Sequence, residues 1–94
     1  MLFRSLDLHG FTEAEARAVV RHEVEESWRR GRRCLLVIHG RGRHSAGGPV
    51  LREALPDWLA TPPLAHRVIA FVTAPERYGG AGATLVLLRP GRKR

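Results

Sequence analysis

The chain has 94 residues and a mass of 10.5 kDa, which suits one domain with one hydrophobic core. Hydrophobic residues make up 44% and charged residues 27%, which excludes a disordered tail, and the single cysteine, Cys34, excludes an internal disulfide. No apolar run approaches the roughly 18 residues of a membrane span, and the net charge of +7 predicts a polyanionic partner.

The first elements are a short strand and a long helix. Residues 3–8 alternate weakly and predict a strand. Residues 12–30 predict a helix, because Thr12 and Glu15 form a capping box and Gly31 follows as a terminator. An apolar residue recurs every four positions within it (Ala16, Val20, Val24 and Trp28). Two glutamate–arginine pairs at i,i+4 spacing add support (Glu25 with Arg29, and Glu26 with Arg30).

The remaining chain completes an α/β pattern. Residues 34–38 are continuously apolar and predict a strand buried on both faces, parallel to the first. After the loop at 39–48, Pro49 suits the first position of a second helix, in which Pro56 predicts a kink or two short pieces. Residues 68–72 and 83–88 predict two more strands around a loop at 74–82. The order is βαβαββ, a four-stranded mixed sheet with two helices on one or both faces.

Polar residues follow the first two predicted strands. Asp7 and His9 are two positions apart, so we expect both side chains on one face, and His39 directly follows the second strand. Because parallel neighbouring strands end at the same edge, these residues and the following glycine loop should converge where α/β sheets bind ligands. Imidazole suits proton transfer near neutral pH, so catalysis is one interpretation; hydrogen bonding at the strand ends is the other.

Two glycine-rich loops are candidate binding elements. Gly40 and Gly42 could present backbone N–H groups to a phosphate, with Arg41 and Arg43 supplying charge, or could form a plain connector. Gly79, Gly80 and Gly82 predict either a close backbone approach or a simple turn. The spacing of Cys34, His39 and His44 does not match a zinc site, so no metal ligands are predicted.

The positive charge is concentrated outside the first helix. Residues 12–28 hold five acidic residues and two arginines, whereas the rest holds fourteen basic and four acidic residues. Six arginines lie between positions 29 and 43, and Lys93 is the only lysine. Arginine binds phosphate through two parallel hydrogen bonds, so nucleic acid is the predicted partner, although a GC-rich genome produces the same bias.

Three motifs together resemble the Smr (small MutS-related) domain family, stand-alone type. They are Asp7-Leu8-His9, His39-Gly40-Arg41-Gly42, and Ala74-Pro75 followed by Gly79-Gly80-Ala81-Gly82-Ala83. The resemblance covers about residues 5–89 and implies a βαβαββ two-layer sandwich similar to the C-terminal domain of bacterial translation initiation factor three. We therefore expect one domain at residues 1–89 and a basic tail at 90–94.

The resemblance implies an endonuclease that cleaves or nicks phosphodiester bonds in DNA or RNA. Asp7 and His9 would serve in cleavage, with His9 as the general base oriented by Asp7 and His39 as a candidate acid. The loop from His39 to Arg43, and Gly79, Gly80 and Gly82, would hold nucleic acid. RNA cleavage needs no metal, whereas Mg²⁺ or Mn²⁺ is left open for DNA. We expect a cytoplasmic monomer that does not bind membranes.

Two further functions remain open from the sequence. One is a non-catalytic nucleic-acid-binding module that acts in DNA repair, in recombination or on ribosome-associated RNA, because charge and a glycine loop suffice for binding. The other is a protein-interaction domain that docks on ribosomes or repair complexes. DNA and RNA cannot be distinguished at this level.

Overall fold

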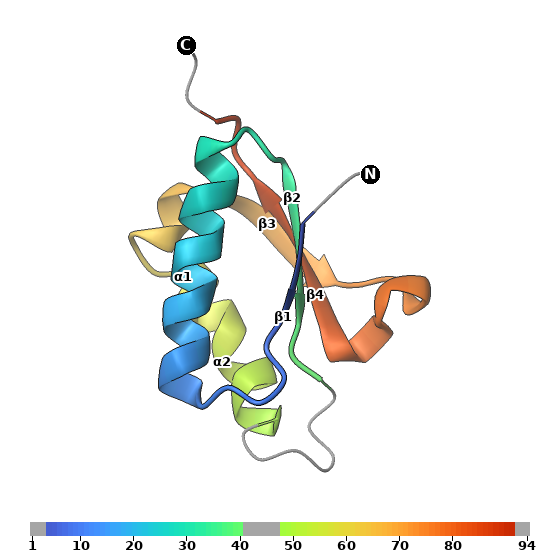
Figure 1. Ribbon diagram of the computed structural model, residues 1–94. Helices are drawn as coiled ribbons and strands as arrows, with labels where there is room; N and C mark the ends of the chain where they lie inside the picture. The colour runs from blue at the N-terminus through green and yellow to red at the C-terminus, as the bar shows by residue number, and fades with distance from the viewer. Residues whose placement is uncertain (1–3, 41–47, 92–94) are drawn as a thin grey trace.

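The computed structural model describes residues 4–40 and 48–91. The order of elements confirms the predicted βαβαββ pattern (Figure 1). The strands and helices are β1 (Arg4–Asp7), α1 (Glu13–Arg29), β2 (Cys34–Ile38), α2 (Gly48–Leu59), β3 (Val68–Thr73) and β4 (Ala83–Leu88). Three short 3-10 turns lie between them: η1 (Leu64–His66), η2 (Glu76–Tyr78) and η3 (Gly80–Gly82).

The sheet has the strand order β1-β2-β4-β3. β1 and β2 are parallel, as predicted, and β4 is antiparallel to both of its neighbours. Both helices cover the same face of the sheet, whereas the segment containing η2 and η3 lies toward the other face (Figure 1). The fold is therefore a two-layer arrangement, which resolves the question of whether the helices occupy one face or both.

The predicted capping box starts α1. The Thr12 hydroxyl accepts the Glu15 backbone N–H at 3.2 Å, and the Glu15 carboxylate accepts the Thr12 N–H at 2.9 Å. These bonds satisfy two backbone groups that a helix start otherwise leaves open. The apolar stripe is buried as predicted at Ala16, Val20 and Val24.

The end of α1 differs from the predicted pattern. Trp28 is only half-buried, and the Arg67 guanidinium lies 3.7 Å from the centre of its ring. Arg67 also makes two hydrogen bonds to Glu25, at 3.0 and 2.9 Å. The hydrogen-bonded partner of Glu25 is therefore Arg67, a residue distant in sequence, and not the predicted Arg29. Arg67 is the main cause of the lowered pKa of Glu25, and the charge of Arg29 lowers it further. The Glu26–Arg30 pair forms at 2.7 Å as predicted.

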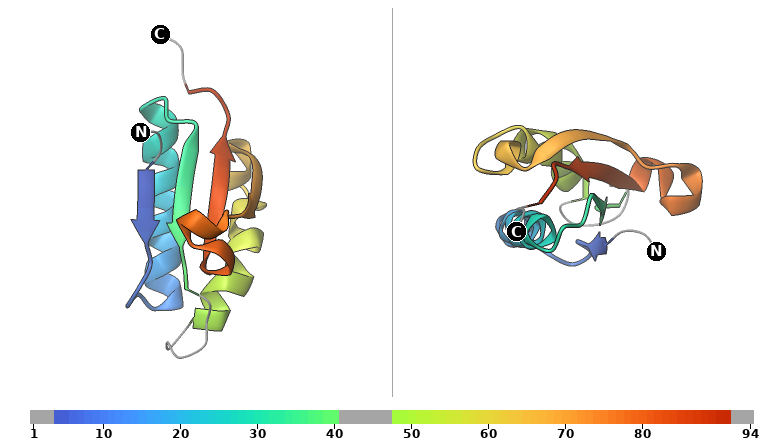
Figure 2. Two further views of the ribbon diagram at one scale, coloured as in Figure 1. Left: turned by 90° about the vertical axis from the view of Figure 1, so that its right-hand side faces the viewer. Right: turned by 90° about the horizontal axis from the view of Figure 1, so that it is seen from above.

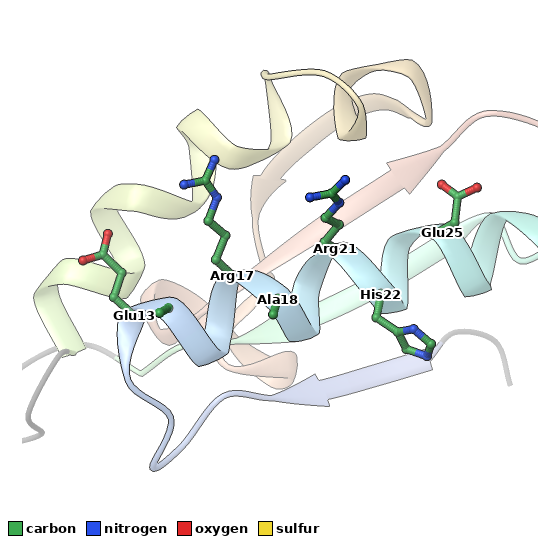
Figure 3. Close-up of a pocket in the computed structure, with 7 residues that line it drawn as sticks. Glu13, Arg17, Ala18, Arg21, His22 and Glu25 are labelled. Atoms are coloured by element: carbon green, nitrogen blue, oxygen red, sulfur yellow. The ribbon is translucent and has the colours of Figure 1, made fainter.

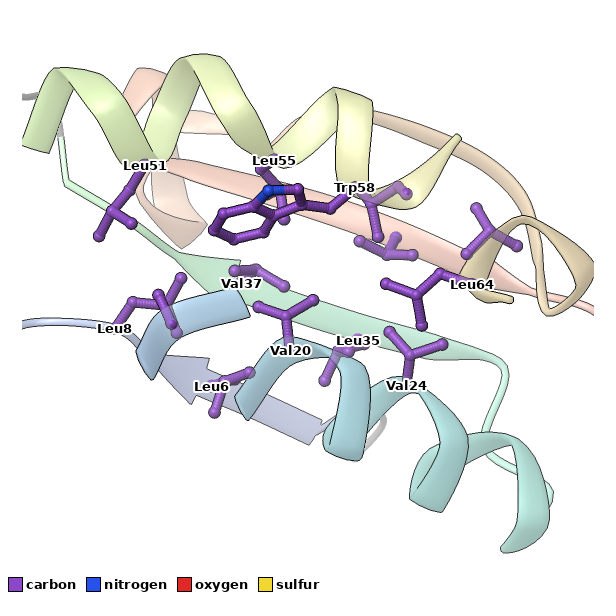
Figure 4. Close-up of a cluster of buried hydrophobic side chains, with 14 of the residues drawn as sticks. Leu6, Leu8, Val20, Val24, Leu35, Val37, Leu51, Leu55, Trp58 and Leu64 are labelled. Atoms are coloured by element: carbon purple, nitrogen blue, oxygen red, sulfur yellow. The ribbon is translucent and has the colours of Figure 1, made fainter. Parts of the chain in front are cut away.

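The main core lies between the helices and the sheet (Figure 4). Leu35 and Val37 of β2 are fully buried there against side chains of both helices (Val20, Val24, Leu51, Leu55 and Trp58). On the opposite face, Leu36 packs with Ala74 and Ala83 in a smaller cluster. β2 is thus buried on both faces, as its apolar run predicted.

The second helix runs unbroken through Pro56. It begins at Gly48, one residue before the predicted start, and the expectation of two short pieces is wrong. Leu51, Leu55 and Trp58 are buried at helical spacing, so packing of this face outweighs the cost of an interior proline. Because proline has no backbone N–H, the usual helical bond to the Arg52 carbonyl cannot form.

The chain after β4 packs back against α1. The Trp28 indole N–H donates to the Pro90 carbonyl at 3.0 Å, and the Arg89 N–H donates to the Arg67 carbonyl at 2.8 Å. Residues 92–94 of the predicted basic tail lie outside the described residues. The domain boundary at residue 89 stays a prediction.

The capping box predicts a measurable loss of stability in Thr12→Ala. Removing this cap should lower the free energy of unfolding by about 1 kcal/mol, because the Glu15 backbone N–H loses its partner. Urea denaturation followed by circular dichroism measures the change. Thr12→Ser keeps the capping oxygen and should stay near the wild type; an alanine variant as stable as the serine variant would contradict the role of the cap.

Candidate functional site

The carboxyl ends of β1 and β2 lie side by side. Asp7 is opposite Ile38 in the parallel register, and the Leu8 N–H donates to the Ile38 carbonyl at 2.9 Å. Figure 2 shows the two strands running in the same direction to one end of the sheet. The antiparallel strand β4 starts at this end, with Ala83 opposite Ile38. The segments that carry the first two motifs therefore meet, as the strand order predicted.

Asp7 organises the turn that carries His9. β1 ends at Asp7, and the Asp7 carboxylate accepts the backbone N–H of His9 at 2.9 Å. Both residues are exposed. Within the part of the chain that the structure describes, this carboxylate forms no hydrogen bond to the His9 imidazole. The shared face expected from strand alternation does not apply, since the strand has already ended.

His39 is buried, and both of its ring nitrogens have partners. Only 6% of the residue is exposed. Nδ1 lies 2.8 Å from the Gly40 carbonyl oxygen, and Nε2 lies 3.0 Å from the Thr84 hydroxyl oxygen. A carbonyl oxygen can only accept, so Nδ1 carries the proton in this contact. In the neutral ring, Nε2 then accepts the proton of the Thr84 hydroxyl.

The surroundings of His39 favour its neutral form. Burial lowers the pKa of the imidazole, and the positive charge of Arg52 lowers it further. The hydrogen bond to the Gly40 carbonyl opposes this shift but does not cancel it. His39 is therefore uncharged near neutral pH.

Sequence reasoning did not identify Thr84 as part of this arrangement. It lies in the apolar strand β4, at the inward-facing position that meets His39. The only signal in the sequence is a threonine within an otherwise apolar run. The pairing of β2 with β4 must be known before this threonine can be identified as a partner of His39.

The glycine loop at residues 79–82 approaches the backbone of His39 and Gly40. The Gly82 carbonyl accepts the N–H groups of both His39 and Gly40, at 3.0 and 2.9 Å. At Gly80, φ is +52°, and a Cβ atom would lie 2.7 Å from a carboxylate oxygen of Glu76. A side chain there is disfavoured by the positive φ, and its Cβ atom would have to displace the Glu76 carboxylate. The predicted close backbone approach is therefore confirmed over the simple turn.

Contact of these loops with nucleic acid stays a prediction. Gly79 is exposed, whereas Gly80 and Gly82 are buried. The backbone hydrogen bonds of Gly80 and Gly82 stabilise the loop itself. Arg41, Gly42 and Arg43, predicted to hold phosphate, lie outside the described residues.

One hollow on the described surface does not include the residues at the strand ends. It measures about 730 Å³ and is lined by α1 alone, including Arg17, Arg21 and His22. The side chains fan out from one helix instead of converging: Arg17 and Arg21 point to one side and His22 to another (Figure 3). Convergence of polar groups is what distinguishes a binding site, so this hollow is not our candidate.

A smaller cavity of about 410 Å³ lies beside His39. It is bounded by α2, β3 and β4, and its lining includes Arg52, Phe71, Thr73 and Thr84. Unlike the hollow on α1, it draws side chains from several elements. It therefore belongs to the same end of the molecule as the two histidine motifs.

The described residues contain no group of three or more His, Cys, Asp or Glu side chains that could hold a metal ion. Cys34 is a half-buried free thiol in β2. No helix in the described part of the chain is long and apolar enough to cross a membrane.

Comparison with known proteins identifies a shared domain. The model of a family described as the Smr domain matches residues 6–89. The ribosome rescue factor SmrB of Tolumonas auensis is 39% identical over 83 residues, which are 88% of this chain and 43% of that protein. SmrB of Escherichia coli (strain K12 / DH10B) is also 39% identical, over 88% of this chain and 41% of its own length. The chain spans about two fifths of the length of these relatives.

Two solved structures share the fold. The Smr domain of Thermus thermophilus MutS2 is 38% identical with a TM-score of 0.78, and the match covers 93% of this chain and 99% of that one. YdaL, a stand-alone small MutS-related protein from Escherichia coli, is 32% identical with a TM-score of 0.80, over 90% and 63% of the two chains. These matches confirm the family resemblance and the predicted fold class.

The depressed pKa of His39 predicts a dependence of stability on pH. As the pH falls below about 6.5, the unfolded chain takes up a proton that the folded chain resists, so the folded state loses stability. Replacing His39 with glutamine removes this proton uptake. Between pH 8 and pH 5, the melting temperature of His39→Gln should therefore fall less steeply than that of the wild type.

Thermal melting followed by circular dichroism measures both slopes. His66→Gln replaces an exposed histidine and is the matched control. Equal slopes for the wild type and His39→Gln would mean that burial does not hold His39 neutral.

Proposed function

Because this chain belongs to the Smr domain family, we propose that it binds RNA and cleaves its phosphodiester backbone, with His9 as the general base. The observation that carries the proposal is the exposed Asp7–His9 turn beside the His39–Gly40 segment, at the carboxyl ends of two parallel strands. Open α/β sheets bind ligands at such ends. The relatives named as ribosome rescue factors support RNA over DNA as the substrate.

The charge of the chain supports a polyanionic substrate. The net charge is +7, and residues 12–28 carry a net negative charge, so the positive charge is concentrated in the rest of the sequence. Phosphate contacts by arginine would supply most of the affinity and make it dependent on salt. We propose Arg41 and Arg43 for these contacts, since they follow Gly40 directly in the sequence.

The proposed reaction uses the 2′-hydroxyl of the RNA as nucleophile. The His9 imidazole takes the proton of this hydroxyl, and the 2′-oxygen attacks the adjacent phosphorus. The bond to the 5′-oxygen breaks, and that oxygen takes a proton from water. The products are a 2′,3′-cyclic phosphate and a 5′-hydroxyl. Asp7 positions His9 through the backbone N–H, which fixes the turn.

His39 has a different proposed role. Its ring nitrogens already bond Gly40 and Thr84, and its lowered pKa leaves little of the protonated form that a general acid requires. We therefore propose that His39 is a positioning residue, which shapes the start of the phosphate-binding loop. This role is preferred over that of the acid suggested by the sequence.

The proposal predicts that His9→Ala loses cleavage and keeps binding. Loss of the general base should slow the reaction by about 10²–10⁴-fold, which is the usual contribution of general acid–base catalysis to a proton transfer. The measurement is cleavage of labelled single-stranded RNA in EDTA, with the product ends identified. His22→Ala is the matched control, since it removes an exposed histidine from α1.

Three results would contradict the proposal. Full activity in a folded His9→Ala protein would exclude His9 as the base. Products ending in a 3′-hydroxyl would indicate attack by water instead. RNA binding without any cleavage by the wild type would favour the non-catalytic binding module.

A further inference from the structure

The cavity beside His39 has the size of a small-ligand site. Its volume of about 410 Å³ lies within the usual range for pockets that bind small molecules. α2 contributes Arg52 and Pro56 to its wall, and β3 contributes Phe71 and Thr73. Thr84 of β4 completes it next to His39. The mechanism proposed above uses none of these side chains except His39.

The polar groups of the cavity combine donors and acceptors. The Thr84 hydroxyl gives its proton to His39, so toward a ligand it offers lone pairs only. The Arg52 guanidinium and the Thr73 hydroxyl are able to donate.

This mixture fits a nucleobase better than a phosphate. A phosphate group presents acceptors only, so lone pairs on Thr84 would repel it. A base presents N–H donors and ring acceptors on its edge and an apolar face on its plane. The half-buried ring of Phe71, with Pro56 and Ala81, supplies apolar surface for that plane.

The cavity also has a suitable position. Thr73 ends β3 and Ala83 begins β4, so the cavity lies at the end of the sheet where β1 and β2 also finish. His39 links the two places, because its backbone pairs with Gly82 while its ring contacts Thr84. A nucleotide bound in the cavity would therefore be a near neighbour, along the RNA chain, of a nucleotide bound at the carboxyl ends of β1 and β2.

We infer that this cavity binds one unpaired base of single-stranded RNA, next to the phosphodiester that is cut. The inference rests on the proposed function for the identity of the ligand. It assigns Arg52 and Thr73 to recognition of a base, and it makes a flexible single strand the preferred substrate. A paired base could not enter, because its edge would already be bonded.

An abasic scan tests this inference by binding alone. The probes are short single-stranded oligonucleotides with 2′-O-methyl groups, which lack the proposed nucleophile, each with one base removed at a different position. Stacking of a base on an aromatic side chain contributes enough that its loss lowers affinity about 5- to 150-fold. We expect a loss of this size at one position and small losses elsewhere.

The variant Arg52→Ala with Thr73→Val should bind the intact probe more weakly than the wild type does, because the edge of the base loses its polar partners. Removing the critical base should then cost the variant less affinity than it costs the wild type, since only the contact with Phe71 is left to lose. Arg17→Ala is the matched control, because it removes one exposed arginine from α1 and should keep the sensitivity to the base. Circular dichroism melts verify that each variant is folded.

The outcomes separate this inference from the proposed function. Cleavage of RNA with equal losses at every abasic position would overturn the base pocket and leave the nuclease standing. A single sensitive position without cleavage of unmodified RNA would support the pocket and contradict the nuclease. Equal weakening of all probes by the double variant would mean that Arg52 contacts phosphate, which also overturns the inference.

Discussion

The central strand β2 determines where every candidate residue lies. β1 pairs with one of its edges in parallel and β4 pairs with the other in antiparallel orientation. The chain leaves β2 at His39, whose backbone and ring both bond the segment that leads into β4. Three stretches that are far apart in the sequence therefore meet at one end of the sheet. Without this pairing, the turn at Asp7, the His39–Gly40 segment and the glycine loop at residues 79–82 would no longer lie together.

The two motif histidines differ because their environments differ. His9 is exposed on a turn that Asp7 holds by its backbone, so its imidazole is accessible to a substrate. His39 is buried, held by two hydrogen bonds and favoured in its neutral form. Accessibility suits a residue that exchanges protons, whereas burial with fixed partners suits one that maintains geometry. This contrast is the physical basis for assigning them separate roles.

Much of the fold could be predicted from local sequence signals. The bounds of β2 and β4 were predicted to the residue, and the capping box identified the start of α1. The meeting of the first two motifs followed from one inference, that β1 and β2 are parallel neighbours. These features depend on periodicity, capping and strand order, all of which can be read from a single chain.

Other features depended on tertiary contacts and could not be predicted. Glu25 pairs with Arg67, which is 42 residues away, instead of with Arg29 on its own helix. The intact helix at Pro56 reflects burial of its apolar face, which outweighs local propensity. The bond from Thr84 to His39 and the cavity beside it require both the pairing of β2 with β4 and the packing of α2.

The state of the His39 ring is the most direct test of this interpretation, because the site geometry and the division of roles both depend on it. Long-range ¹H–¹⁵N correlation spectra of the histidine rings report which nitrogen carries the proton. We expect His39 to be neutral at pH 7, with the proton on Nδ1, because burial lowers the pKa of its imidazole. A proton on Nε2 of a neutral ring, or a His39 ring that is already charged at pH 7, would contradict this interpretation.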